Sequence, residues 1–76
     1  MPDIDLQLRG EYIELDKLLK ATGLADSGGQ ARAFITAGDV QVDGQVELRK
    51  TAKIRAGRTV TFGTSTVRVI QGPGGG

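Results

Sequence analysis

The side chains best suited to bind a charged ligand are gathered in one basic segment. Half of the ten lysines and arginines in the chain fall within residues 49–58. They are Arg49, Lys50, Lys53, Arg55 and Arg58. Cations at this density are typical of a surface that binds phosphate groups. A charged loop beside a sheet edge, where lysine prevents strands of different molecules from pairing, would have the same composition.

A second group of candidate residues precedes the basic segment, at the start of an expected helix. The group is Ser27, Gly28, Gly29 and Gln30, followed by Arg32. Free amides at the positive end of a helix dipole can hold a phosphate, and glycines let a ligand approach because they carry no Cβ. Two other interpretations stay open. The glycines could form a loop before a later helix start, and Arg32 could be an ordinary solvated side chain.

The composition excludes most catalytic chemistry. The 76 residues include no cysteine and no histidine, which excludes disulfides, thiolate or histidine catalysis and Cys/His zinc sites. A chain of 8.0 kDa also offers little wall for a closed substrate pocket. We therefore expect no enzyme, no cofactor and no metal. We expect a cytoplasmic location, because the chain lacks cysteine and its acidic start has no apolar leader. Its apolar runs of at most three residues are too short to span a membrane.

The small net charge of +1 hides a strong asymmetry along the chain. Residues 1–26 carry six acids and three bases, a net charge of −3. Residues 27–76 carry three acids and seven bases, a net charge of +4. This distribution indicates a polyanion-binding face and a separate acidic face.

Hydrophobic periodicity predicts the elements that position these residues. Alternating apolar residues predict a strand over residues 4–8, and leucines at helical spacing predict a helix that ends near Gly23. A second helix is expected over residues 28–37, capped by Asp26 or Ser27 and closed by Gly38. Short strands follow, and the apolar alternation predicts that one of them extends through Leu48.

A tight turn at Asp43-Gly44 joins the first two of these strands in a hairpin, and later strands lie near residues 60–62 and 67–69. Helices grouped before strands predict an α+β fold with two short helices packed on a small antiparallel β-sheet. We expect residues 1–71 to form a single domain and residues 72–76 to form a disordered glycine-rich tail.

An ordered set of these residues resembles the S4-type RNA-binding domain, also called the alpha-L motif. The matching positions are Leu15-Asp16-Lys17-Leu18-Leu19, then Ser27, Ala31 and Ile35, then Gly38-Asp39-Val40-Gln41-Val42-Asp43-Gly44, and finally Gly57, Val60 and Phe62. The third block is similar to the family's G-x-V-x-V-[ND]-G signature. The resemblance is greatest to the short stand-alone bacterial members, the YbcJ-like group, on the block Glu47-Leu48-Arg49-Lys50. The sequence departs from the family at Gly28, Arg58 and Glu14, where arginine, aspartate and a basic residue are frequent.

The resemblance implies that the second helix and the following basic loop contact the phosphate backbone of structured RNA, such as ribosomal or tRNA-like RNA. The implied contact residues are Ser27, Gly28, Gly29, Gln30, Arg32, Arg49, Lys50, Lys53 and Arg55. Phe34 and Phe62 occupy expected core positions, which leaves Tyr12 and no stacking platform for single-stranded RNA. Recognition would then depend on the shape of the RNA. We expect the chain to act as a monomer.

Two other classes of protein fit part of the sequence. A β-grasp sulfur carrier ends in Gly-Gly, and this chain ends in Gly74-Gly75-Gly76. The helical period of residues 27–37, the short opening segment 6–10 and the interruption by Pro73 count against that class. The other alternative is a protein-binding adaptor that uses the acidic residues between positions 3 and 16.

Overall fold

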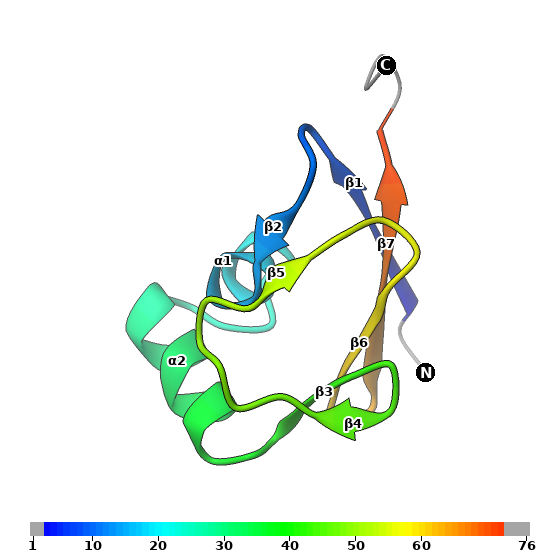
Figure 1. The fold of residues 1–76 in the computed structure, drawn as a ribbon. Coiled ribbons are helices and arrows are strands. Elements are labelled where there is room, and N and C mark those ends of the chain that lie inside the picture. Colours follow the sequence, from blue (N-terminus) through cyan, green and yellow to red (C-terminus); the bar gives the residue numbers. More distant parts are fainter. Residues whose placement is uncertain (1–2, 73–76) are drawn as a thin grey trace.

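The computed structural model describes residues 3–72, and Figure 1 shows their arrangement. Of the predicted tail 72–76, residues 73–76, including the terminal glycines that a sulfur carrier would use, lie outside the described residues. The amide of Gly72 donates to the Leu8 carbonyl at 3.1 Å. The elements in chain order are β1 (Asp3–Leu8), β2 (Ile13–Glu14), α1 (Leu15–Ala21), α2 (Gly28–Thr36), β3 (Val40–Val42), β4 (Gln45–Val46), β5 (Lys53–Ile54), β6 (Thr59–Phe62) and β7 (Ser65–Gln71). Neither helix is long and apolar enough to cross a membrane.

The strands form two sheets. The larger sheet has five strands in the order β1-β7-β6-β3-β4, and the smaller sheet pairs β2 with β5. The α+β class with two short helices and a small sheet is confirmed. The sheet is mixed and not antiparallel as predicted, because β1 runs parallel to β7. Alternation within a strand shows which side chains are buried but not which strand lies beside it or in which direction.

Local signals at both ends of α2 explain its bounds. The Ser27 side chain caps the helix by accepting a hydrogen bond from the Gln30 amide, and Gly28 is the first helical residue. The alternative in which the two glycines form a loop is therefore wrong. Gly38 has a φ of 82°, which glycine adopts without a Cβ clash, so the chain can turn directly into β3.

The hydrophobic core lies between the two helices and the five-stranded sheet (Figure 1). Its fully buried large side chains are Leu15, Leu18, Leu19, Ile35, Val40, Val60, Val67 and Val69. At the rim of this core, the rings of Phe34 and Phe62 stack with their centroids 4.5 Å apart. Both phenylalanines are partly buried and pack against the core, as the sequence pattern predicts.

The turn at Asp43-Gly44 has positive φ at both residues, 52° and 85°, and connects β3 to β4 as predicted. However, β4 ends at Val46, and Leu48 is 60% exposed, so the predicted extension of this strand is wrong. The Glu47 amide still donates to the Val40 carbonyl at 3.0 Å, and the chain then leaves the sheet and reaches α1, as described below.

Candidate nucleic-acid interface

Backbone hydrogen bonds attach the basic segment to the start of α1. The amide of Leu15 donates to the Ala52 carbonyl at 2.9 Å, and the amide of Asp16 donates to the Lys50 carbonyl at 3.0 Å. Glu14, at the N-cap position, makes no side-chain cap, so these carbonyls satisfy amides that a helix start leaves free. Strand β5 then pairs with β2, immediately before α1. The basic segment is thereby fixed beside the helices.

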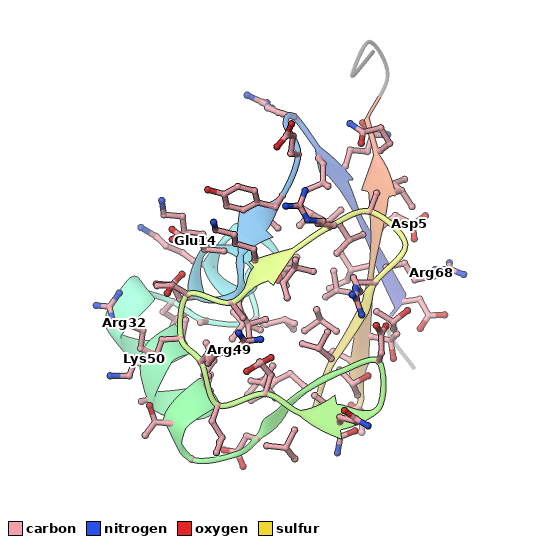
Figure 2. The ribbon with its side chains drawn as sticks, viewed as in Figure 1. Asp5, Glu14, Arg32, Arg49, Lys50 and Arg68 are labelled. Carbon is pink, nitrogen blue, oxygen red and sulfur yellow. The ribbon has the colours of Figure 1, made fainter. Side chains whose placement is uncertain are left out.

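This attachment brings Lys50 next to α2. A shallow, open hollow between them is lined by Gly29, Arg32, Ala33, Thr36, Ala37 and Lys50. Figure 2 shows Arg32 and Lys50 on the same side of the molecule. The structure thus joins three of the predicted contact residues from two separate segments of the chain.

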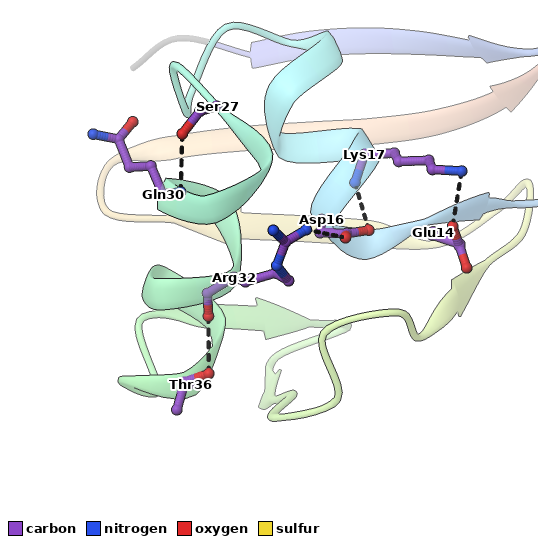
Figure 3. Close-up of polar contacts among 7 residues, drawn as sticks. All are labelled: Glu14, Asp16, Lys17, Ser27, Gln30, Arg32 and Thr36. Atoms are coloured by element: carbon purple, nitrogen blue, oxygen red, sulfur yellow. Dashed lines mark hydrogen bonds and ion pairs between the residues drawn. The ribbon is translucent and has the colours of Figure 1, made fainter.

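The first turn of α2 leaves two amides available at the edge of this hollow. Ser27 Oγ accepts from the Gln30 amide at 3.1 Å (Figure 3). Gln30 Oε1 accepts from the Asp26 amide at 2.6 Å. The amides of Gly28 and Gly29 take no acceptor from residues 3–72. A Cβ on Gly29 would have Ser27 Oγ at 3.9 Å as its nearest neighbour, so a ligand can approach this amide closely.

Arg32 is not an ordinary solvated side chain, because it pairs with an acid on α1. Its Nη1 lies 3.4 Å from Asp16 Oδ2, and the other carboxylate oxygen accepts from the Lys17 amide at 2.8 Å (Figure 3). The Asp16 side chain is 9% exposed, whereas that of Arg32 is 48% exposed. Arg32 therefore compensates a buried carboxylate and still presents half of its surface to solvent. The polar side of the predicted first helix gave no sign that Asp16 would be buried.

Arg49 also has an acidic partner within the chain. Its guanidinium contacts both carboxylate oxygens of Glu47, at 3.1 and 3.2 Å, and its amide donates to the same group at 3.0 Å. These hydrogen bonds lower the pKa of Glu47 and raise the pKa of Arg49. Arg49 is 80% exposed, but its charge is largely compensated. The acid two residues before it is the sequence signal for this pairing.

Lys53 precedes and Arg55 follows the buried Ile54 in the sequence. The side chains of both cations reach the ring of Tyr12. Lys53 Nζ lies 5.1 Å and Arg55 Cζ lies 5.8 Å from the ring centroid. Within residues 3–72, neither cation forms an ion pair, and Lys50 likewise has none. Sequence reasoning did not connect Tyr12 with these cations because they are about 40 positions apart in the chain.

The fold and this face define a small α+β binding domain with a cationic surface beside a helix start. The S4 domain model matches residues 6–70, and the chain belongs to this family. It is 49% identical over 59 residues to "Putative RNA-binding protein YbcJ" of Escherichia coli (strain K12). It is equally identical to "Uncharacterized protein YbcJ" of Shigella flexneri, and each alignment covers 78% of this chain and 84% of the relative.

A solved structure has the same architecture. The solution structure of YbcJ from E. coli, reported as revealing an alfaL motif involved in RNA-binding, superposes with a TM-score of 0.66. The two are 44% identical, and the match covers 92% of this chain and 87% of the other. The resemblance predicted from the sequence is confirmed by the family and by this structure. The β-grasp alternative is wrong, since the chain has the S4 fold.

Proposed function

We propose that this chain binds structured RNA without catalysing a reaction, through α2 and the basic segment. The observation that carries the proposal is the placement of Lys50 beside the free amides at the start of α2. The E. coli relative, named "Putative RNA-binding protein YbcJ", and its solved structure, with an alfaL motif involved in RNA-binding, support it. Residues 1–71 would act as one monomeric unit in the cytoplasm, and the RNA would be ribosomal or tRNA-like.

The geometry divides the proposed contacts into groups with different roles. Lys50, Lys53 and Arg55, which form no ion pair within residues 3–72, would provide charge for phosphates. The amides of Gly28 and Gly29, which the Ser27–Gln30 cap leaves free, would donate hydrogen bonds to one phosphate oxygen. The exposed part of Arg32 would add a contact beside them, whereas Arg49 must first leave Glu47 and contributes least.

Phosphate contacts release counterions, so the affinity should fall steeply as salt is raised. We expect the variant Lys50→Ala/Lys53→Ala/Arg55→Ala to reduce the slope of log affinity against log salt concentration by about 2 to 3, since each phosphate contact contributes about 0.7 to 0.9. Fluorescence anisotropy with a labelled, folded ribosomal RNA fragment across a salt series measures this slope.

A matched control removes three cations elsewhere. In Arg9→Ala/Lys20→Ala/Arg68→Ala the net charge changes equally, but the cations lie after β1, on α1 and on β7. This variant should retain a slope close to that of the wild type. Equal slopes for both triple variants would show that only net charge matters and would contradict the proposed interface. A protein partner recovered in stoichiometric amount, and insensitive to ribonuclease, would favour the adaptor alternative.

A further inference from the structure

The outer face of the β2-β5 sheet carries an exposed aromatic ring. Ile13 pairs with Ile54 across this sheet, and Ile54 is buried against the core. Side chains alternate along strands, so Lys53, next to Ile54 in β5, lies on the opposite, outward face. Tyr12 directly precedes β2, contacts Lys53 and is 40% exposed. A large aromatic side chain at the surface is a candidate contact for a planar ligand.

The charges around this ring favour a ligand that is both planar and anionic. Lys53 Nζ and Arg55 Cζ lie 5.1 and 5.8 Å from the ring centroid, and neither is held by an acid within the described chain. The nearby carboxylate of Glu14 is engaged by Lys17 at 3.0 Å, an ion pair that raises the pKa of Lys17. The two cations beside Tyr12 therefore remain available for a phosphate.

We propose that Tyr12, Lys53 and Arg55 form a subsite for one unpaired nucleotide of the bound RNA. The base stacks on the Tyr12 ring, and Lys53 and Arg55 bind the adjoining phosphates. An exposed cation–π contact is weaker than base–aromatic stacking, so the cations can leave the ring for phosphates when a base arrives. Bases within an uninterrupted duplex are already stacked and cannot reach the ring.

This subsite rests on the proposed RNA binding and narrows its ligand class. The preferred RNA is a helix with an adjoining unpaired nucleotide, and not an uninterrupted duplex. The sequence alone indicated no stacking platform, because it contains one tyrosine and does not show which residues contact that tyrosine in the fold. The pairing of β2 with β5 supplies those neighbours.

The test compares two hairpin RNAs with equal numbers of phosphates, one with a single-nucleotide bulge and one fully paired in its stem with a closed, structured loop. Tyr12→Ala and Tyr12→Leu should each weaken binding of the bulged RNA about fivefold or more, and leave binding of the paired RNA within about twofold. Tyr12→Phe keeps the ring and should retain the wild-type affinity. Ile70→Ala, at a position on β7 that is 38% exposed, is the matched control and should bind both RNAs as the wild type does.

An independent readout uses the wild-type protein. Tyr12 is the only tyrosine, so its ring protons give one unambiguous set of NMR signals. These signals should shift upfield on addition of the bulged RNA and much less with the paired RNA. If Tyr12→Leu weakened the binding of both RNAs equally, or if the Tyr12 ring signals did not shift, the subsite would be overturned. If the wild type binds neither RNA, the proposed function itself fails, whereas tight binding of both with no effect at Tyr12 removes only the subsite.

Discussion

The arginines of the candidate interface differ in whether an acid already holds them. Arg32 and Arg49 have partners at hydrogen-bonding distance, whereas Arg55 has none within residues 3–72. The sequence-based prediction treated all three arginines as equivalent contact residues. Arg32 uses only Nη1 for Asp16, so its other donors can contact a phosphate while the pair persists, whereas Arg49 uses Nε and Nη2 for Glu47 and must break these contacts first.

At Arg32, we expect a cost to stability as well as to binding. Arg32→Ala leaves the Asp16 carboxylate, whose side chain is 9% exposed, without its cation, and this should lower the free energy of unfolding by about 1–3 kcal/mol. Urea denaturation measures the change. Arg68→Ala is the control, because its partner Asp5 is 54% exposed and such surface pairs contribute about 0.5 kcal/mol. Equal costs for both variants would contradict the role assigned to Arg32.

Asp43 should make stability depend on pH in the acid range. Hydrogen bonds from Arg58 at 2.7 Å and from the Thr59 amide at 3.0 Å lower its pKa. A lowered carboxyl pKa contributes stability above the unfolded-state pKa, about 3.9, which is lost as the pH falls through the folded-state value.

Asp43→Asn removes the charge but tolerates the left-handed backbone at this turn position, where φ is 52°. The wild type should therefore be more stable than the variant at neutral pH, and the difference should shrink at a pH of about 3. Urea midpoints at the two pH values test this. A difference that is independent of pH would exclude the charge as its cause.

At the scale of single elements, the start of α2 links helix stability to ligand access. Alanine is favoured over glycine within a helix by about 0.5–1 kcal/mol, and a Cβ at Gly29 meets no atom closer than 3.9 Å. Gly29→Ala should therefore raise the melting temperature while it weakens RNA binding, because the new methyl group stands where the RNA backbone approaches.

Differential scanning calorimetry and anisotropy titration measure the two effects of Gly29→Ala separately. The control is Ala33→Gly on the same helix, which should lower the melting temperature through the same propensity difference without adding an atom to the hollow. If Gly29→Ala left RNA affinity unchanged, close approach at this amide would be ruled out.

Elements with a clear local signal could be predicted, and those formed by distant pairing could not. Both helices have apolar spacing and end signals such as Ser27 and Gly38, and the structure confirms them. By contrast, β5 contains only Lys53 and Ile54, too short to show alternation, and it forms because β2 lies beside it. The candidate site follows the same division: the sequence identified its cations, while Asp16 and Tyr12 joined them only through tertiary contacts.

At the scale of the whole molecule, the acidic and basic parts of the chain are not separate faces. Asp16 pairs with Arg32, and Asp5 pairs with Arg68, so acids of the first 26 residues neutralise bases of the remainder. The cations at positions 50, 53 and 55 differ from the others because no acid in the described part of the chain pairs with them. Net charge alone could not have indicated this.

A core built from so few large side chains should be sensitive to a single cavity. Leu18 is fully buried, and Leu18→Ala should cost about 2–5 kcal/mol. A chain of this length has a total stability of about 4–11 kcal/mol, so this single substitution should remove a large fraction of it. Circular dichroism during urea titration measures this loss. A cost below about 1 kcal/mol would mean that the core relaxes around the missing atoms.

The parallel pairing of β1 with β7 also determines when the fold can be completed. Asp5 and Arg68, which face each other across these strands, are separated by 63 positions, a long loop to close relative to the length of the chain. High contact order of this kind slows folding, and a ribosome must synthesise residues 65–71 before residues 3–8 have a partner. The two helices are synthesised before β7 and can pair during translation. Strand β1 can join the sheet only after β7 has been synthesised, and until then the apolar side chains of β1 are accessible to chaperones.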